Sequence, residues 1–276
     1  AVLPAMREAE TWGVPRRLVH VIDAEADSAA WFRLWNAEGH LFLVRTDFTR
    51  KVRCEGELSL LPDLAERLWR EGRYVEGEPV AIRDRTGRHF VAEVEVELDR
   101  PARMRTSEGR KKIGGPPLRL RLILTCVLDE AGEVLAEWYL LTNVPPDVDA
   151  QTIATWYYRR WRIETFHKLL KSAGHEVEAW LQRSASAVAR RLLVAAMACV
   201  LAWRIERTEG PQADECRRVL VRLSGRQTKR SRPVTTPALL AGLGVLLPML
   251  ALLEEYSPAQ LRRLLAPHLP RAMLSG

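Results

Sequence analysis

The sequence predicts an α/β fold that opens with a β–α–β unit, continues as antiparallel strands and ends in helices. Three observations lead to this prediction. Two apolar runs that end on acids flank a helical stretch within residues 16–47, and alternating apolar and polar residues fill about 76–143. After Pro145 and Pro146 the apolar spacing becomes helical.

The opening unit consists of "RRLVHVID" (16–23) as a buried strand, "EADSAAWFRLWNAEG" (25–39) as a helix and "HLFLVRTD" (40–47) as a second strand. This order is typical of parallel strands joined by a crossover helix. A further helix is expected within 58–72, after Pro62.

The middle of the chain alternates as half-exposed antiparallel strands do, in "HFVAEVEVEL" (89–98), "PLRLRLILTCVL" (117–128) and "LAEWYLLTN" (135–143). The segment "RPARMRTSEGRKKIGGPP" (100–117) is basic and rich in Gly and Pro, which predicts a mobile loop. Its function is open between a solvated hairpin tip and a contact with nucleic acid.

The second half is predicted to be helical. Asp149 is the expected N-cap of a helix that continues to about Ser172, and "SASAVARRLLVAAMACVLAWRIER" (184–207) and "SPAQLRRLLAPHL" (257–269) are further helices. The tract 215–233 contains one acid followed by seven basic residues: Arg217, Arg218, Arg222, Arg226, Lys229, Arg230 and Arg232.

Length and composition are those of a globular protein with one large domain or two modest ones. Lys and Arg number 42 against 35 Asp and Glu, a net charge of +7. This basic excess favours an anionic partner such as nucleic acid, although proteins of many other functions are equally basic.

The cysteines are dispersed, which suits a reducing compartment and predicts no zinc site, because the sequence contains neither a CxxC pair nor a Cys/His cluster. No signal peptide is recognised at the start. The apolar run 238–253 contains Gly242, Gly244 and Pro248 and is expected to be a buried helix or helix pair, not a membrane span.

Charged residues cluster in "WYYRRWRIETFHKLLK" (156–171). At about 100° per residue, a continuous α-helix places a hydroxyl, a guanidinium, a carboxylate and an ammonium within a strip about 60° wide. The opposite face carries apolar side chains that can pack against a core. The strip consists of Tyr157, Arg160, Glu164 and Lys171, and the apolar face of Ile163, Phe166 and Leu170.

Two interpretations of the strip compete. In the first, the charges are solvated neighbours on a helix surface and stabilise it by a few tenths of a kcal/mol per pair. In the second, Tyr157, Arg160 and Lys171 bind a phosphate and Glu164 binds a divalent metal, because phosphoryl transfer needs acidic metal ligands and cationic donors together.

The pattern Tyr157-x2-Arg160-x3-Glu164-x6-Lys171 resembles the Tyr–Arg–Glu–Lys signature of DDE transposases of the insertion-sequence-four type, the group that includes the transposon-five transposase. The flanking "RRWRIETFHKLLK" is also similar. Upstream, "VIDAEAD" (21–27) resembles that family's second-aspartate segment, which makes Asp23 the metal-binding acid at a strand end.

This resemblance implies a partial RNase H-like core formed by 1–47 and 145–182, a mainly β insertion at 48–144, and a helical C-terminal region at 183–276. It implies cut-and-paste transposition by two ions of Mg²⁺ (or Mn²⁺) held by Asp23 and Glu164. The partners it implies are double-stranded DNA, as transposon ends and target, and a second copy of the chain, without a membrane. The implied location is the bacterial cytoplasm, in association with the nucleoid.

Two aromatic positions belong to the same comparison. Trp138 matches a tryptophan that, in relatives, is associated with stacking on a flipped DNA base. The alternative is that Trp138 is simply a packed residue on a strand. His167 lies in the segment that is similar to the family's sequence. The alternative is that it is an ordinary histidine on the helix surface or packed against a neighbour. Glu25 and Asp27 are close enough to Asp23 to compete for the metal, and the strand-end position favours Asp23.

One difference from the family pattern affects the activity expected of this chain. The family needs a third acid on an opening strand, and the only acids before Asp23 are Glu8 and Glu10, in a helix-like stretch. The chain therefore looks like the carboxy-terminal portion of a transposase, and we expect little strand cleavage from it alone. The alternatives are a non-catalytic DNA-binding remnant or inhibitor, and a helical protein-interaction domain.

Overall fold

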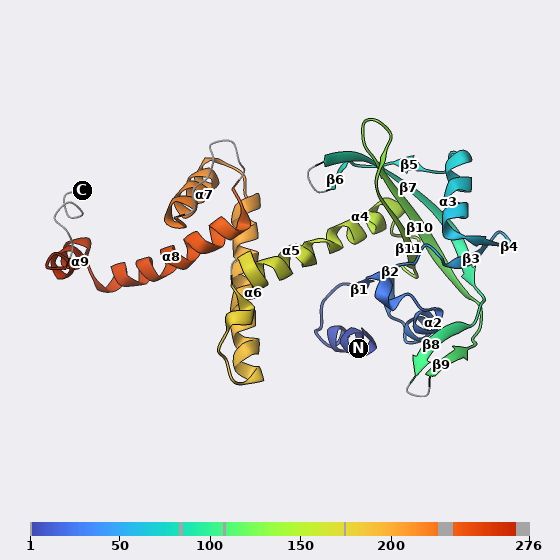
Figure 1. Cartoon of the computed structure of the whole chain (residues 1–276), viewed down its shortest axis with the longest axis horizontal. Coiled ribbons are helices and arrows are strands. Elements are labelled where there is room, and N and C mark those ends of the chain that lie inside the picture. The colour runs from blue at the N-terminus through green and yellow to red at the C-terminus, as the bar shows by residue number, and fades with distance from the viewer. Residues whose placement is uncertain (1, 83–84, 107–108, 174, 226–233, 269–276) are drawn as a thin grey trace. The chain divides into compact units, whose positions relative to one another are not determined.

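The chain forms two compact units, residues 1–161 (the N-terminal unit) and 162–276 (the C-terminal unit). Figure 1 shows both units in the computed structural model. The structure describes residues 2–82, 85–106, 109–173, 175–225 and 234–268.

The N-terminal unit combines four helices and a 3-10 turn with a mixed sheet, counted over the described residues. The helical elements are α1 (Val2–Glu10), η1 (Ala24–Ala26), α2 (Ala29–Ala37), α3 (Leu61–Arg70) and α4 (Ala150–Arg160). The strands are β1 (Val19–Ile22), β2 (Leu41–Arg45), β3 (Lys51–Cys54), β4 (Glu57–Leu60), β5 (Val75–Glu76), β6 (Val80–Ile82), β7 (Arg85–Leu98), β8 (Ala102–Thr106), β9 (Gly109–Ile113), β10 (Leu118–Leu128) and β11 (Val134–Thr142).

The predicted β–α–β opening is confirmed. β1 pairs with β2 in parallel, with Val19 opposite Leu41 and Ile22 opposite Val44, and α2 connects the two strands. A parallel pair needs such a crossover, because a tight turn can only reverse the chain direction.

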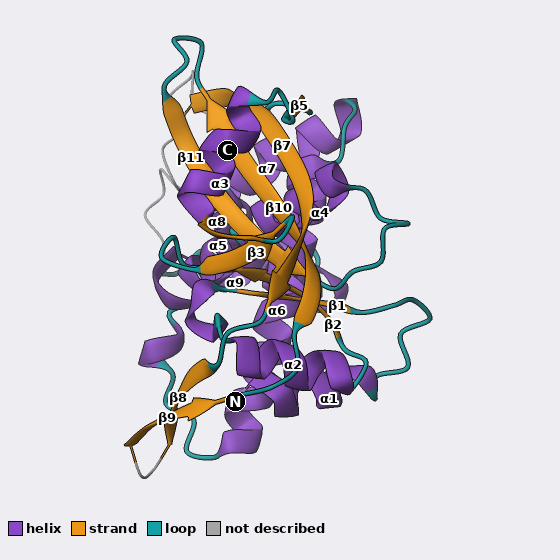
Figure 2. Cartoon of the chain, turned by 90° about the vertical axis from the view of Figure 1, so that its right-hand side faces the viewer, coloured by secondary structure: helices purple, strands orange, loops and turns teal. Residues whose placement is uncertain are grey.

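The remaining long strands extend the same sheet in antiparallel fashion. The order is β1-β2-β11-β10-β7-β3-β4, with β5 and β6 also paired to β7. Figure 2 shows β7, β10 and β11 running side by side. The strands of the predicted insertion therefore join the β1–β2 pair directly, through three β11–β2 residue pairs that include Thr142 opposite Leu43. The fold is thus mixed α/β with a mostly antiparallel open sheet, consistent with an RNase H-like core.

Alternation along the strands sorts apolar side chains onto two faces of this sheet. On one face, Phe42 and Leu122 pack with α1, α2 and α3 in the larger core cluster. On the other face, Leu43 and Ile123 pack against α4, which contributes Tyr157. Because neighbouring residues of a strand point to opposite faces, both layers follow from the period of two.

The segment predicted as a loop at 100–117 forms the hairpin β8–β9 over part of its length, so that prediction is wrong in its secondary structure. The base of the hairpin is held by Arg33 of α2. Its guanidinium donates to the carbonyl oxygens of Pro116, Leu98 and Arg100 at 2.8, 3.1 and 3.2 Å. Residues 107 and 108 lie outside the described part of the chain.

The C-terminal unit is helical in its described residues, as predicted. Its elements are α5 (Arg162–Lys168), a π-helical turn η2 (Leu169–Ala173), a 3-10 turn η3 (Val177–Ala179), α6 (Ala185–Arg207), α7 (Pro211–Leu223), α8 (Thr236–Glu255) and α9 (Pro258–Leu265). Leu169, Cys199, Leu220 and Leu239 meet in its core. The Ser184 hydroxyl accepts from Ala187 N and begins α6 where the sequence placed it.

The apolar run at 238–253 belongs to the single continuous helix α8, which passes through Pro248. The prediction of a buried element holds only for its first half, because residues beyond Gly244 such as Leu247 and Leu250 are exposed. Within the described residues, α6 and α8 are long and apolar enough to cross a membrane. That observation is weak evidence by itself, since core helices of soluble proteins meet the same criteria.

Candidate active site

Asp23 directly follows β1 and caps the turn η1, where its Oδ1 accepts a hydrogen bond from Ala24 N at 2.7 Å. Parallel strands bring their carboxyl ends to the same edge of a sheet. Arg45, the last residue of β2, therefore lies beside Asp23, with its Nη2 atom 2.8 Å from Asp23 Oδ1.

Helix α4 supplies two further contacts to the same carboxylate. Arg160 Nη2 lies 3.1 Å from Asp23 Oδ2, and the Tyr157 hydroxyl donates to Oδ1 at 3.3 Å. The start of α4 is fixed by the predicted cap, since Asp149 Oδ1 accepts from Thr152 N at 2.8 Å. The fold thus brings together three of the residues that the sequence singled out.

The environment keeps Asp23 ionised. Burial acts to raise the pKa of this carboxyl, but the Ala24 N–H, the guanidinium groups of Arg160 and Arg45, and the Tyr157 hydroxyl together hold the pKa below its usual value. An ionised carboxylate between two fixed cations results. Its side chain is 36% exposed, so ligands can reach it from solvent.

Tyr157 is buried, with 4% of its surface exposed, so its ring lies in the core of the N-terminal unit and not on an exposed face of the helix. Trp138 of β11 packs at 6.1 Å from the Tyr157 ring centroid, and the Arg160 guanidinium lies over the same ring at 5.5 Å. Burial also raises the pKa of Tyr157, so its hydroxyl remains a proton donor. The ring therefore orients Arg160 toward Asp23.

The two acids that follow Asp23 have different surroundings. Asp27 forms an ion pair with Arg50 and accepts a hydrogen bond from Asp47 N at 2.9 Å, and its side chain is 6% exposed. Glu25 is exposed on η1. Asp27 is therefore occupied in joining the η1 turn to the chain after β2.

The helix expected to run unbroken from Asp149 to about Ser172 is divided. Helix α4 ends at Arg160, α5 begins at Arg162, and a π-helical turn follows from Leu169. A strip computed at 100° per residue assumes one regular α-helix and does not extend across these interruptions. The division between the two units also falls here, after Trp161.

Glu164 and Lys171 lie on the C-terminal unit, on α5 and η2. Glu164 is exposed and, among the described residues, has no hydrogen-bond or ion-pair partner. Lys171 Nζ lies 3.9 Å from Glu178, and both side chains are well exposed. An exposed ion pair at this distance contributes little to stability. The charges of Glu164 and Lys171 are therefore both available to a ligand.

The apolar face predicted for this helix is confirmed at two of its three positions. Leu170 is 7% exposed, and the Phe166 ring packs 6.1 Å from that of Trp203. Ile163 is 48% exposed, contrary to the prediction, because it stands in the first turn of α5, next to the interruption at Trp161. The His167 ring lies 6.2 Å from that of Phe166.

Comparison with known families decides the assignment. The family model described as the transposase DDE domain matches residues 6–201, about seven tenths of the chain. The chain belongs to this family. A search of curated proteins found no match. The match covers the Asp23 segment and the whole Tyr157–Lys171 pattern, and the family implies a DNA substrate and divalent metal ions.

The donor set of this transposase domain suits such an ion. Ionised carboxylates are the ligands that Mg²⁺ and Mn²⁺ prefer, and the guanidinium groups of Arg45 and Arg160 suit the non-bridging oxygens of a phosphate. Arg45 was not singled out from the sequence. Its place at the end of the strand paired in parallel with β1 is the signal that could have identified it.

A cavity of about 560 Å³ adjoins the η1 turn of the transposase domain. It is lined by four cationic side chains and two acids: Arg50, Lys51, Arg100, Lys112, Asp27 and Asp47. The excess of cations suits the backbone of an anionic polymer. No sequence pattern indicated this cavity, because its walls come from four separate segments.

The basic tract 215–233 is only partly described. Arg217 stabilises the fold, because its Nη1 donates to the carbonyl oxygens of Ile205 and Thr208 at 2.7 and 2.6 Å at the end of α6. Arg218 is exposed and forms an ion pair with Glu215 at 2.6 Å. Arg226, Lys229, Arg230 and Arg232 lie outside the described residues.

Proposed function

We propose that the chain acts in cut-and-paste DNA transposition, through metal-dependent phosphodiester hydrolysis and strand transfer, with Asp23 and Glu164 as the metal-binding carboxylates. The observation that carries this proposal is the cluster at Asp23, an ionised carboxylate at a strand end bracketed by Arg45 and Arg160. Glu164, free of described partners, is the second acid of the proposed pair.

The roles follow from the charges. Mg²⁺ (or Mn²⁺), when bound, activates the attacking oxygen and stabilises the leaving one. Arg160 and Arg45 already point cationic N–H groups at the carboxylate, and the same groups can donate to non-bridging phosphate oxygens beside it. Tyr157 donates from a buried ring, and Lys171 adds an exposed ammonium.

Trp138 is proposed to stack on a DNA base. Its indole is partly buried against the Tyr157 ring, so a base stacked on it would lie next to the proposed phosphate site. The cations of the cavity beside η1 are proposed to hold the DNA backbone, with an affinity that falls as salt rises.

A homodimer is proposed as the working form. Helix α6 exposes a stripe of apolar side chains at helical spacing, which includes Leu193, Met197 and Val200 at 61 to 64% exposure. A second copy of the chain bound to paired DNA ends would cover such a stripe. The division into a two-part core, 1–47 with 145–182, an insertion at 48–144 and a helical region at 183–276 remains part of this proposal.

A second candidate function is a non-catalytic DNA-binding protein or inhibitor. The observation that favours it is the state of Asp23, whose two oxygens both lie within ion-pair distance of a guanidinium. A cation must compete with these arginines for the carboxylate. Because a metal ion must displace these guanidinium groups from Asp23, we propose that the chain cleaves DNA weakly.

A nicking assay on a transposon-end duplex with Mg²⁺ or Mn²⁺ separates the two functions. Weak, metal-dependent nicking that disappears in Glu164→Ala and Asp23→Asn, with DNA binding retained, supports the transposase. The matched control is Glu254→Ala, an exposed acid on α8. Absence of nicking with retained binding supports the non-catalytic function, and robust Glu164-dependent nicking overturns the prediction of weak activity.

A further inference from the structure

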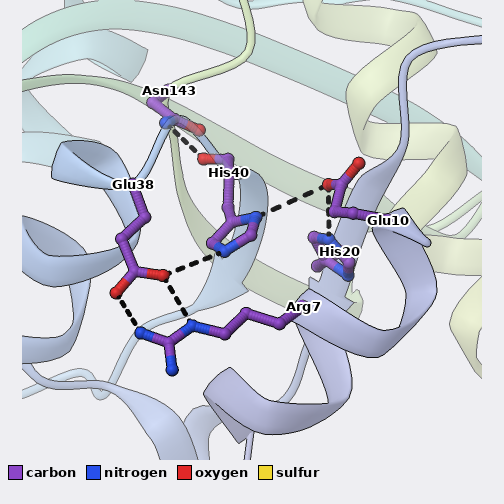
Figure 3. Close-up of polar contacts among 6 residues, drawn as sticks. All are labelled: Arg7, Glu10, His20, Glu38, His40 and Asn143. Carbon is purple, nitrogen blue, oxygen red and sulfur yellow. Dashed lines mark hydrogen bonds and ion pairs between the residues drawn. The ribbon is translucent and has the colours of Figure 1, made fainter.

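Two histidines and a glutamate converge at the edge of the sheet, on the N-terminal unit. Glu10 ends α1, His20 lies in β1, and His40 directly precedes β2. Glu10 Oε1 is 3.3 Å from His20 Nε2 and 3.5 Å from His40 Nδ1, and the three atoms all lie within 4.8 Å of one another. Figure 3 shows both imidazole rings directed at the Glu10 carboxylate.

These separations fit a tetrahedral metal ion. Bonds of about 2.0–2.1 Å at tetrahedral angles place neighbouring ligand atoms about 3.3–3.4 Å apart. The two distances to Glu10 Oε1 have this length, and each exceeds an ordinary hydrogen bond. The His20–Glu10 contact is also a long hydrogen bond when no ion is bound, so a cation between the three atoms would replace it.

The surroundings of His40 match those of a metal ligand. His40 is buried, and its second ring nitrogen, Nε2, lies 3.4 Å from Glu38 Oε2. Nε2 is buried without a hydrogen bond of its own, and the Glu38 carboxylate is placed to accept a hydrogen bond from Nε2–H once an ion holds Nδ1. Glu38 is itself held by Arg7, whose Nε and Nη2 donate to its two oxygens at 2.9 and 2.6 Å.

The backbone around His40 is held as well. Asn143 Nδ2 donates to the His40 carbonyl oxygen at 2.9 Å, and Asn143 Oδ1 accepts from Phe42 N at 2.9 Å. The main chain of His40 is thus held, and its ring lies between the Glu10 and Glu38 carboxylates (Figure 3). Of the three ligands, Glu10 is the most exposed, which leaves one coordination position on the solvent side.

We propose that Glu10, His20 and His40 bind one divalent cation of the borderline class, such as Zn²⁺, with three protein ligands and one solvent position. Two imidazoles and one carboxylate favour Zn²⁺, Co²⁺ or Ni²⁺ over Mg²⁺, which prefers oxygen ligands. This centre is separate from the carboxylates proposed for catalysis. The sequence showed no sign of this cluster, because the fold brings together residues that the chain separates by 10 and 20 positions.

The proposed role of the ion is to fasten α1 to the strands that carry the active-site residues. Helix α1 otherwise contacts the sheet mainly through Met6, which is 2% exposed, with Val2 and Leu3 partly buried. His20 lies in β1, three residues before Asp23, which directly follows that strand. An ion bound to α1, β1 and the start of β2 therefore stabilises the strand that ends at Asp23.

Titration of the full chain with Co²⁺, followed by the visible absorption of the tetrahedral ion, tests the proposal. We expect one ion per chain, displaced by Zn²⁺ and unaffected by excess Mg²⁺. Glu10→Gln and His20→Ala should each weaken binding by about 100-fold or more, and Glu38→Gln by about 10–100-fold. His268→Ala, which changes a histidine near the end of α9, is the matched control and should bind as the wild type does.

Thermal unfolding gives a second measurement that does not depend on the spectrum. Zn²⁺ should raise the melting temperature of the wild type and of His268→Ala, and it should not raise that of Glu10→Gln, whose exposed side chain makes misfolding an unlikely source of the difference. Absence of tetrahedral Co²⁺ binding, or equal affinity in the wild type, Glu10→Gln and His20→Ala, overturns the proposal.

Discussion

The two units bury their apolar residues to very different extents. In the N-terminal unit, three helices and one face of the sheet enclose a cluster in which Phe32, Trp35 and Phe42 are fully buried. In the C-terminal unit, the cluster around Cys199 and Leu239 is small, and α6 and α8 leave many large apolar side chains exposed. Burial of apolar area is the main favourable term in folding. The first unit therefore buries the larger share of apolar area, and the second leaves an apolar surface that suits a partner.

The same contrast holds for the two acids matched to the family pattern. Asp23 is held by two arginines, a tyrosine and a backbone N–H, whereas Glu164 is exposed without a described partner. A preorganised carboxylate costs little to position when a ligand binds. The N-terminal unit thus holds Asp23 in a preorganised setting, whereas Glu164 on the C-terminal unit has no such setting among the described residues.

The largest effect is expected in the N-terminal core. Phe32→Ala removes a fully buried ring and should lower the free energy of unfolding by about 3–5 kcal/mol. Val194→Ala on α6, at 65% exposure, should change it by less than about 0.5 kcal/mol. Urea denaturation followed by circular dichroism measures both. A large loss in Val194→Ala would mean that the α6 face is covered in solution.

Two glycines of α8 should respond in opposite directions. A Cβ at Gly242 would overlap the Leu220 carbonyl group of α7, so Gly242→Ala should destabilise the C-terminal unit by about 1–3 kcal/mol. Gly244 has open space around it, and Gly244→Ala should stabilise α8 by about 0.5–1 kcal/mol. Thermal unfolding compares the pair, and equal shifts would show that α7 and α8 do not pack this closely.

The exposed stripe on α6 should govern self-association. The double substitution of Leu193→Glu with Met197→Glu should raise the dimer dissociation constant by about tenfold or more, because it places charges in an apolar contact. Sedimentation equilibrium with and without DNA ends measures the constant. Val75→Glu, an equally exposed apolar position of the N-terminal unit, is the control, and an equal change in both variants would exclude α6 as the interface.

The smallest effect is expected at the candidate active site. Tyr157→Phe keeps the packed ring and removes one donor to Asp23, so it should cost less than about 1 kcal/mol and raise the pKa of Asp23 toward its usual value. The folded-state pKa of Asp23 is lowered, so its stabilising contribution is present above the unfolded-state value of about 3.9. That contribution is lost as the pH falls through the folded-state value.

The difference between wild type and Tyr157→Phe should therefore narrow between pH 7 and about pH 3. Urea midpoints across this range, together with carboxyl NMR titration of Asp23, measure it. Tyr158→Phe is the matched control, because the Tyr158 hydroxyl donates to the Ala81 carbonyl oxygen at 2.7 Å and its loss should not vary with the charge of an acid. Parallel pH profiles for the two variants would contradict a role for Tyr157 at Asp23.

Local patterns predicted the elements well. The alternation at 89–98 and 117–128 predicted β7 and β10, the apolar runs at 16–23 and 40–47 predicted a parallel pair, and Asp149 predicted the start of α4. The interruption at Trp161 and the π-helical turn at Leu169 were not predictable from a fixed angle per residue. The sequence pattern assumed one regular α-helix, whereas the structure ends α4 at Arg160 and continues through α5 into a π-helical turn.

By itself, the sequence determined the order of the strands and helices, the residues of the family pattern and the position of Asp23 at a strand end. Only the tertiary structure decided that Arg45 lies against Asp23, that the Tyr157 ring is buried, and that Glu10 meets His20 and His40. The physical reason is the separation along the chain of the residues that make each contact. Periodicity records which face of an element is buried, whereas contacts between distant residues depend on strand register and helix packing, which no local pattern contains.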